Sequence, residues 1–439
     1  MQTLLHEASR ASSKSIFTKL ESNVRGYCRN YPSVFSRAQN AILIDEGGRE
    51  YVDFLAGAGT LNYGHNNPYL KEVLLHYIAE NGVTHGLDLY TTAKRDFLEA
   101  FQRFILAPRE MSYKIQFTGP TGTNAVEAAL KIARNLTGRA NIVSFTNSFH
   151  GVTLGSLAVT GNSYYRDASG VPAYHSTFMP YDGYFGESVD TLSYLERMIT
   201  DTGSGVDLPA AVIVETIQGE GGVNEASYRW LRGLQHLCNE HGILMIIDDI
   251  QTGIGRTGPF FSFEDAQISP DIITLSKSLS GYGLPLSIVL MKPSHDAWKP
   301  GQHNGTFRGN SLAFVTATEM LSRYWRDSGF NGRVQQKSWK LGSGLHRLRE
   351  RYPGIVGVRG RGLLFGVECA SPELAECIRD VAFQKGLIVE TCGPRDHVVK
   401  LLPPLTVEPE VLDRGLALFE EAVDVAHLKQ SPGRLQGDL

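Results

Sequence analysis

Two charged residue types that are rarely buried without a partner follow strongly apolar stretches of this sequence. Lys277 comes after "DIITLS", and Asp248 comes after "ILMII" and precedes a second aspartate, Asp249. A charge in a protein interior is costly unless it is paired. Because burial lowers the pKa of a lysine and makes its amine nucleophilic, we expect Lys277 to react covalently. The carboxylate either caps a neighbouring turn or lies against a buried cation.

Two further motifs also follow apolar stretches. In "TGPTGTNAVEAAL", Gly122 and Thr123 stand where a helix pattern begins. Backbone N–H groups and the dipole at such a helix start suit a phosphate, although Thr121 or Thr123 as a plain N-cap explains the motif equally well. In "SFHG", Phe149 offers an aromatic face to a ligand or packs in the core.

The elements that position these residues alternate between strand and helix patterns. Short apolar runs predict strands with both faces buried, at residues 114–119, 141–146, 210–215, 243–249, 271–277 and 286–291. Residues 123–138 and 227–242 carry apolar side chains at helical spacing, and each stretch ends on a glycine. This alternation predicts an α/β fold with a mostly parallel sheet, whose strands bring their carboxyl ends to one edge.

The two ends of the chain differ from this middle part. Residues 1–60 and the stretch after Tyr324 mix longer helix patterns with short strands such as "GLLFGVE". We therefore expect an N-terminal segment, residues 1–60, that joins a small domain, a large α/β domain over residues 61–324, and a small α+β domain over residues 325–439. The last residues, from Gln430 on, are expected to form a frayed tail.

A glycine-rich motif, "GIGRTG" at residues 253–258, matches the spacing of dinucleotide-binding loops. In such loops the glycines connect a strand directly to a helix. Here "DDIQT" separates the apolar strand from the glycines, and "PFF" follows where a helix would have to begin. The context therefore argues against a dinucleotide site.

The four remaining motifs together match the needs of one cofactor, pyridoxal 5'-phosphate (PLP). Its phosphate needs backbone N–H groups, its ring an apolar face, its ring nitrogen a carboxylate and its aldehyde a lysine amine. These groups are supplied at the predicted carboxyl edge of the sheet by "TGPTGTNAVEAAL", Phe149, Asp248 and Lys277. Lys277 is then placed at a buried strand end because its amine is used in a covalent bond.

The longer motifs carry a resemblance to a known family. Together, "IIDDIQTGIGRTG", "LSKSLSGYGLPLS" and "HNGTFRGN" resemble the class III, or subgroup II, PLP-dependent aminotransferases, and the similarity extends from about Phe35 to Val407. The resemblance implies a fold type I transferase with a large, mostly parallel seven-stranded sheet and a smaller α+β domain built from both chain ends. It also implies a homodimer or a higher homo-oligomer, and no metal.

The resemblance assigns roles to individual residues. It implies that Lys277 binds the cofactor covalently and acts as the catalytic base and acid, while Asp248 pairs with the pyridine nitrogen. The other implied cofactor contacts are Gly122 and Thr123 at the phosphate, Phe149 on the ring face, Gln251 at the ring hydroxyl, and Thr306 at the phosphate that the neighbouring subunit binds.

Two departures from the family bear on the substrate. An arginine that commonly follows the "FHG" motif is replaced by Val152, and the arginine that precedes "xxPPL" is replaced by Lys400. Because lysine is a point charge and not a bidentate fork, carboxylate binding must differ in detail. The family's switching glutamate falls on Glu220, which is expected to pair with Lys400 for a diamine donor and to release it for glutamate.

Within the family, stretches such as "FLAGAGTLNYGHNNP" are most similar to the branch that acts on L-2,4-diaminobutyrate and 2-oxoglutarate in ectoine or siderophore synthesis. This similarity implies transfer of an amino group from L-glutamate to L-aspartate 4-semialdehyde. Three alternatives remain open: another ω-amine such as ornithine or 4-aminobutyrate, PLP chemistry without transfer, and a binding protein without activity. Val152 counts against 4-aminobutyrate, and the presence of Lys277 and Asp248 counts against the inactive protein.

Composition and charge limit the partners. The 439 residues are 42% hydrophobic and carry a net charge of −4 with both signs interspersed, which argues against nucleic acid. No apolar run approaches the roughly 20 residues of a membrane span. The five cysteines are scattered without a CxxC pair, as in a cytoplasmic protein. The Ser-rich N-terminus lacks a secretory apolar segment, and we interpret it as a plain arm or a transit peptide.

Overall fold

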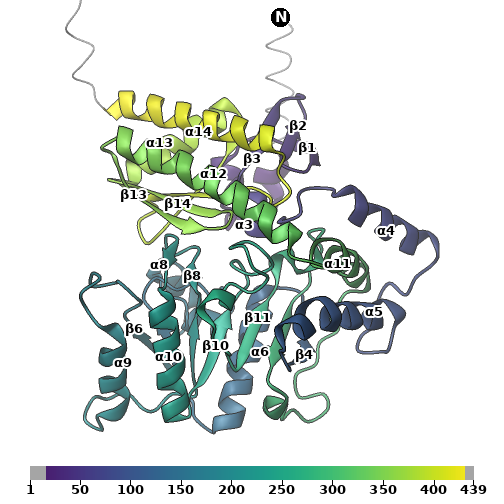
Figure 1. Cartoon of the computed structure of the whole chain (residues 1–439), viewed down its shortest axis with the longest axis vertical. Helices are drawn as coiled ribbons and strands as arrows, with labels where there is room; N and C mark the ends of the chain where they lie inside the picture. Colours follow the sequence, from purple (N-terminus) through teal and green to yellow (C-terminus); the bar gives the residue numbers. More distant parts are fainter. Residues whose placement is uncertain (1–15, 431–439) are drawn as a thin grey trace, which may run out of the picture.

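A computed structural model describes residues 16–430, and the predicted N-terminal arm and nearly all of the predicted C-terminal tail lie outside these residues. Figure 1 shows a lower part built around one large sheet and an upper part built around smaller sheets, where segments from both ends of the chain lie together. The predicted limits of the domains at residues 60 and 324 stay a prediction. Among the described residues, no helix has the length and hydropathy that a membrane crossing requires.

The large sheet has seven strands in the order β4-β12-β11-β10-β7-β5-β6. Strand β12 pairs antiparallel with both β11 and β4, while the other neighbouring pairs are parallel. The prediction of an α/β fold with a mostly parallel seven-stranded sheet is therefore confirmed. In sheet order, the strands span Lys114–Phe117, Ile288–Met291, Ile272–Leu275, Leu244–Asp248, Ala211–Val214, Ile142–Phe145 and Ser176–Met179.

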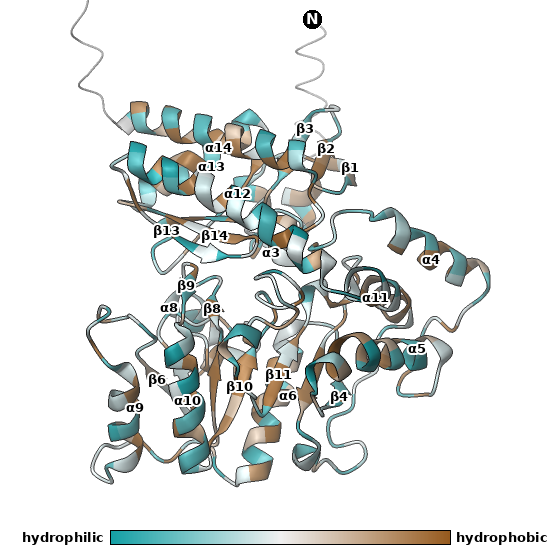
Figure 2. Ribbon diagram, in the orientation of Figure 1, coloured by the Kyte–Doolittle hydropathy of each residue, from teal (hydrophilic) through white to brown (hydrophobic). Residues whose placement is uncertain are grey.

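The large sheet is apolar because helices cover both of its faces. Side chains alternate along a strand, so Ile246 of β10 packs in the cluster that contains α6, while Ile247 packs in the cluster that contains α10. Figure 2 shows hydrophobic residues along β10 and β11 and hydrophilic residues on α10. The helices on this sheet are α6 (Gly122–Thr137), α9 (Thr191–Thr200) and α10 (Tyr228–His241).

The predicted helix ends are confirmed for α6 and α10. Gly138 and Gly242 follow these helices with φ angles of 68° and 57°. Glycine adopts this left-handed conformation without the steric penalty of a Cβ atom, which makes it a common helix stop. In contrast, "GIGRTG" forms turns and no helix follows it directly, as expected from its context.

The upper part contains two four-stranded sheets, in the orders β1-β2-β3-β15 and β13-β14-β17-β16, and the short pair β8-β9 lies nearby. Strand β15 pairs parallel with β3, which joins segments from opposite ends of the chain. Helices α12 (Gly329–Arg351), α13 (Pro372–Lys385) and α14 (Pro409–Gln430) cover these sheets (Figure 1). The strands span Phe35–Gln39 (β1), Ile42–Asp45 (β2), Glu50–Asp53 (β3), Ile217–Gln218 (β8), Asn224–Glu225 (β9), Ile355–Arg361 (β13), Leu364–Cys369 (β14), Leu387–Ile388 (β15), Glu390–Cys392 (β16) and Val398–Leu401 (β17).

The remaining helices connect these layers. Helix α11 packs against both α4 and α5 beside the large sheet (Figure 1). Their bounds are Tyr27–Asn30 (α2), Ala56–Gly59 (α3), Pro68–Ala79 (α4), Thr92–Phe101 (α5), Leu154–Ala158 (α7), Ser163–Arg166 (α8) and Ser311–Tyr324 (α11).

Candidate active site

A cleft of about 350 Å³ lies at the carboxyl edge of the large sheet. Four neighbouring strands, β5, β7, β10 and β11, end beside it, and the polar residues at or just after their ends line it. These ends are where ligands bind in sheets of this kind. The lining residues from the strand ends and from the start of α6 include Gly122, Thr123, Phe149, His150, Glu215, Glu220, Asp248, Ile250, Gln251 and Lys277.

Lys277 lies at a sharp turn immediately after β11. Its φ angle is 45°, in the left-handed region, where a non-glycine residue costs about 1 kcal/mol or more. Within the described residues its ammonium makes no hydrogen bond or ion pair. Burial lowers the pKa of the Lys277 amine, and nearby Lys400 adds to this effect, although Glu220 opposes it. The result is an amine with enhanced nucleophilicity that faces the cleft.

Asp248 ends β10 and is 4% exposed. Its Oδ2 lies 2.7 Å from Nδ1 of His150, and its Oδ1 accepts hydrogen bonds from Thr274 Oγ1 at 3.1 Å and from the backbone N–H of Ile250 at 3.2 Å. The carboxylate therefore caps the turn, as one of the two sequence alternatives expected, and it also contacts a buried ring. These contacts hold Asp248 in one orientation beside the cleft.

Asp249 has a different task from its neighbour. It accepts hydrogen bonds from Thr252 Oγ1 at 2.8 Å and from the backbone N–H of Ser262 at 3.0 Å. Burial raises the pKa of Asp249 to about 6, against the effect of these hydrogen bonds. Asp249 does not line the cleft, and its role is to hold the loop that follows β10.

The start of α6 forms one wall of the cleft. Thr121 is the N-cap of this helix, and Asn124 Oδ1 accepts a hydrogen bond from the Thr121 backbone N–H at 3.2 Å. A Cβ atom on Gly122 would lie 3.0 Å from the Ile250 side chain, a contact so tight that Ile250 would have to shift, and glycine avoids it. Thr123 Oγ1 lies 2.8 Å from Ser156 Oγ, which fixes the hydroxyl at the helix start. The helix is thus capped in the ordinary way and still presents backbone N–H groups to the cleft.

Lys400 lies on β17 and is completely buried. Its Nζ is 2.7 Å from Glu220 Oε1 and 3.2 Å from Glu390 Oε1. Glu220 also accepts a hydrogen bond from Gln251 Nε2 at 3.0 Å, which ties the pair to the cleft. Burial disfavours the charge of Lys400, but the two carboxylates outweigh it and raise the pKa of Lys400 well above its ordinary value. The structure thus pairs Glu220 with Lys400, as expected from the sequence, and adds a second carboxylate.

The two carboxylates beside Lys400 ionise differently. Burial raises the pKa of Glu220, but Lys400 and Lys277 outweigh this effect and bring it well below its ordinary value. Burial also raises the pKa of Glu390, and here Lys400 reverses only part of the effect, so that the pKa is about 7. Glu220 is therefore the ionised partner of Lys400 at neutral pH.

The family model for class-III aminotransferases matches residues 26–423. The chain belongs to the class-III aminotransferase family. It is 60% identical to the diaminobutyrate–2-oxoglutarate transaminase of Bordetella parapertussis, over 95% of this chain and 96% of that protein. It is 54% identical to the enzyme of the same name from Halalkalibacterium halodurans, over 93% of this chain and 96% of that protein. Among solved structures, it is similar to the ornithine aminotransferase of Toxoplasma gondii, with 26% identity, a TM-score of 0.84, and coverage of 98% and 99% of the two chains.

Membership of the class-III aminotransferase family confirms the prediction of PLP as cofactor, and the Toxoplasma enzyme is described with partial occupancy of PLP at its active site. The cleft of this chain fits the cofactor. Lys277 provides an amine that has no hydrogen-bond partner among residues 16–430, and Gly122 adds no side chain at the helix start. Two buried polar atoms of the lining residues, His150 Nε2 and Glu215 Oε2, have no hydrogen-bond partner within the described residues. Such atoms at the wall of a cleft suit a polar ligand.

Three residues of the site were not identified from the sequence: His150 and Ile250 line the cleft, and Glu390 lies behind it, beside Lys400. His150 lies in the quoted "SFHG" motif, but only the fold shows that it contacts Asp248. Ile250 follows the two aspartates and lines the cleft together with Phe149, so two apolar side chains are available to a ring. Glu390 lies directly opposite Lys400 in the β16–β17 pair, and the alternation of "IVETC" is the only sequence signal for it.

Two other predictions concern residues at the margins of the cleft. Val152 lines the cleft and is 58% exposed, and none of the described lining residues is an arginine that could replace the family's. Thr306 is exposed and does not line the cleft of its own chain. The chain therefore does not bring Thr306 to the same place as Lys277.

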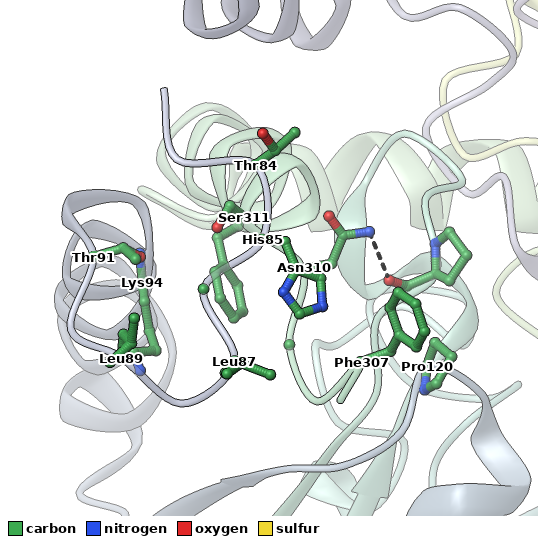
Figure 3. Close-up of a pocket in the computed structure, with 14 residues that line it drawn as sticks. Thr84, His85, Leu87, Leu89, Thr91, Lys94, Pro120, Phe307, Asn310 and Ser311 are labelled. Atoms are coloured by element: carbon green, nitrogen blue, oxygen red, sulfur yellow. Dashed lines mark hydrogen bonds between the residues drawn. The ribbon is translucent and has the colours of Figure 1, made fainter. Parts of the chain in front are cut away.

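A second pocket of about 390 Å³ lies next to the loop that carries Thr306 (Figure 3). His85 lies edge-on to Phe307, with the ring centres 5.3 Å apart, and Asn310 Nδ2 donates to the backbone oxygen of Pro285 at 3.4 Å. No carboxylate is among the described residues that line this pocket. It therefore lacks the acid and base pairs that distinguish the cleft around Lys277.

Proposed function

We propose that this class-III aminotransferase transfers the amino group of L-glutamate to the terminal carbon of L-aspartate 4-semialdehyde, in a reversible reaction that gives L-2,4-diaminobutyrate and 2-oxoglutarate. The observation that carries the proposal is the 60% identity over 95% of the chain to a diaminobutyrate–2-oxoglutarate transaminase. The contacts around Lys277, Asp248 and Lys400 explain how the chain performs each part of this reaction.

The cofactor is held by residues from three elements. Lys277 binds it covalently, the start of α6 at Gly122 and Thr123 holds its phosphate, and Asp248 holds its ring nitrogen. Phe149 and Ile250 offer apolar contact to the ring, and Gln251 offers a hydrogen bond to the ring hydroxyl. When bound, PLP supplies an aldehyde that takes up the amino group and a ring that accepts the electrons of the breaking C–H bond.

Lys277 is the proton carrier of the reaction. Its amine would remove the proton from the carbon that bears the transferred nitrogen and later return a proton to complete the transfer. Because burial lowers the pKa of Lys277, a larger fraction of the amine is neutral and able to act as the base near neutral pH. The hydrogen bond between His150 Nδ1 and Asp248 Oδ2 keeps the carboxylate fixed while this proton moves.

Glu220 and Lys400 adapt the cleft to its two substrates. L-Glutamate carries a carboxylate on its reacting carbon, which needs a cation, whereas the terminal carbon of diaminobutyrate carries none. We expect Glu220 to stay on Lys400 for the terminal amine and to release it for glutamate. The 2.7 Å distance between the two groups and the position of Glu220 in the cleft wall support this exchange.

The active enzyme is a homodimer in this proposal. Thr306 lies on an exposed loop outside the cleft of its own chain, and its role is to contact the phosphate that a second copy binds. Light scattering of the purified protein should give at least twice the mass of one chain. A Thr306→Ala variant should remain a dimer and bind PLP less tightly, and a monomeric wild type with full activity would contradict this part of the proposal.

A panel of amino donors tests the substrate. With 2-oxoglutarate as acceptor, L-2,4-diaminobutyrate should give a kcat/KM at least about tenfold higher than ornithine or 4-aminobutyrate. Double-reciprocal plots of the initial rate against the donor concentration, at several fixed concentrations of the acceptor, should be parallel lines. This pattern is expected because the amino group is transferred in two separate steps. A clear preference for ornithine or for 4-aminobutyrate would refute diaminobutyrate as the substrate.

A further inference from the structure

The buried ammonium of Lys400 has two carboxylates beside it, although an exchange between a terminal amine and glutamate requires only one. Glu220 accepts a hydrogen bond from Lys400 Nζ at 2.7 Å. Glu390 Oε1 lies 3.2 Å from the same nitrogen and is buried, but it forms no hydrogen bond within the described residues. A buried carboxylate oxygen without a hydrogen bond is unfavourable, so its presence calls for a function.

The two carboxylates differ in how freely they can move. Glu390 is 5% exposed and belongs to β16, where it is the direct register partner of Lys400 in β17. Glu220 lies in the connection between β8 and β9, between Gly219 and Gly221, and its side chain is 23% exposed. The strand pairing therefore fixes Glu390 against Lys400, whereas Glu220 is able to swing into the cleft.

We propose that Glu390 is a positioning residue that retains and orients the Lys400 ammonium whenever Glu220 leaves it, and so permits the chain to accept glutamate with a lysine in place of an arginine. This inference rests on the proposed function. A lysine ammonium has three N–H donors on one atom. One donor turns to Glu390 when Glu220 departs, and the others remain for the carboxylate of the substrate.

The free-energy cost of an unpaired buried charge explains why Lys400 needs a fixed partner. A fully buried lysine that loses its only carboxylate carries an uncompensated charge, which is strongly unfavourable. Without Glu390, Glu220 would be held on Lys400, and the cleft would remain in the form that suits a terminal amine. With Glu390, the departure of Glu220 leaves Lys400 paired and still directed toward the cleft, because β16 and β17 do not move apart.

The two half-reactions, measured separately by the absorbance of the PLP-loaded enzyme, test this proposal. Glu390→Gln should slow the reaction with L-glutamate by about tenfold or more, which corresponds to one charge-assisted hydrogen bond, and should change the reaction with L-2,4-diaminobutyrate by less than about twofold. Glu390→Asp retains the charge and should recover much of the glutamate rate. Equal slowing of both half-reactions, or a faster reaction with glutamate, would overturn the proposal.

A matched control and a binding measurement complete the experiment. Glu368 lies on β14, next to β17, and pairs with Arg359 of β13. It does not line the cleft, so Glu368→Gln should leave the ratio of the two half-reactions unchanged. Calorimetry should show that 2-oxoglutarate binds the PLP-loaded Glu390→Gln protein about tenfold more weakly than the wild type. Unchanged affinity would refute the role of Glu390.

Failure of this inference is distinguishable from failure of the proposed function. If the wild-type protein reacts with glutamate but prefers a terminal amine other than diaminobutyrate, the proposed substrate is wrong. The Glu390 variants are then compared with that other amine. If Glu390→Gln does not fold, Glu390→Asp provides the test. This variant keeps the charge, so its reaction with glutamate should remain close to that of the wild type. A selective loss of the glutamate reaction in Glu390→Asp would contradict a role that depends on the charge.

Discussion

His150 and Asp248 form a 2.7 Å contact between two side chains that are almost completely buried, with the histidine 2% and the aspartate 4% exposed. The other ring nitrogen of His150, Nε2, has no hydrogen-bond partner in the part of the chain that the structure describes. The ring therefore serves Asp248 through Nδ1 alone. In the proposed function Asp248 holds the ring nitrogen of PLP, and His150 would then set the direction from which that carboxylate meets the cofactor.

Replacement of His150 by phenylalanine keeps most of the ring volume and removes the partner of Asp248. We expect the dissociation constant for PLP, from absorbance titration of the cofactor-free protein, to rise about tenfold, since a buried carboxylate oxygen loses its hydrogen bond. The control is His236→Phe on the exposed face of α10, which should bind PLP like the wild type. Unchanged affinity in the His150 variant would show that Asp248 does not depend on this ring.

Two partly buried lysines permit a test of whether position or pKa decides covalent binding. Burial lowers the pKa of Lys337 to about 8, and it also lowers the pKa of Lys277. Lys337 Nζ donates to the backbone oxygen of Leu405 at 2.8 Å and lies outside the cleft. After incubation with PLP and reduction with borohydride, peptide mass spectrometry should find the adduct on Lys277 and not on Lys337. An adduct on Lys337 at comparable yield would contradict this assignment.

Arg256 links the "GIGRTG" loop to the upper part of the molecule. Its fully buried guanidinium donates to Asn62 Oδ1 at 2.6 Å and to the backbone oxygens of Leu363 at 2.8 Å and Pro403 at 2.6 Å. Arg256→Lys retains a charge but not the fork of donors, so we expect a loss of about 3 kcal/mol in the free energy of unfolding. Urea denaturation measures this loss. The exposed pair of Arg197 with Asp201 provides the control, and Arg197→Lys should cost less than about 0.5 kcal/mol.

The stability that Glu220 contributes should depend on pH. Lys400 and Lys277 together hold the pKa of Glu220 below its value of 4.5 in the unfolded chain, so the folded protein binds fewer protons in the acid range. The contribution is therefore complete above about pH 4.5 and is lost as the pH falls through the folded-state pKa. Glu220→Gln should cost about 1–2 kcal/mol at pH 7, because Glu390 remains beside Lys400.

Urea midpoints of the wild type and the Glu220→Gln variant at several pH values check this prediction. Their difference should stay constant from pH 7 down to about pH 5 and shrink as the pH is lowered further toward 2. Exposed Glu240 is the control, and its change to glutamine should shift the midpoint little at any pH. A difference between the wild type and the Glu220 variant that grows on acidification would have the wrong sign and would refute the ion pair as the cause.

Much of the large sheet was predictable because burial on both faces leaves a clear pattern. Every residue of β7, "AVIV", and of β11, "IITL", is buried. Strand β6, "STFM", was missed because it is an edge strand with mixed polarity and only its last residue is buried. The reversed direction of β12 has no signature in its own residues. It follows from its connection to β11, which contains only the short 3-10 turn Lys277–Ser280 and no crossover helix.

The site was predictable where a polar group had no other explanation. Asp248 and Lys277 stand at the ends of apolar strands, and a charge there requires a partner or a use. Glu390 was not predictable in the same way, since its proximity to Lys400 comes from the pairing of β16 with β17. His150 contacts Asp248 only because β5 and β10 end at the same edge, a relationship that depends on strand order. The role of Thr306 depends on a second copy of the chain.

The parallel pair of β3 and β15 places Val52 beside Leu387, across most of the length of the chain. During synthesis on the ribosome, the early strands β1, β2 and β3 emerge long before their fourth neighbour exists. Contacts between such distant segments form slowly, because a long loop must close first. A nascent chain that stops before residue 387 should therefore expose the edge of β3, and a chaperone that binds extended apolar segments would find its target there until translation is nearly finished.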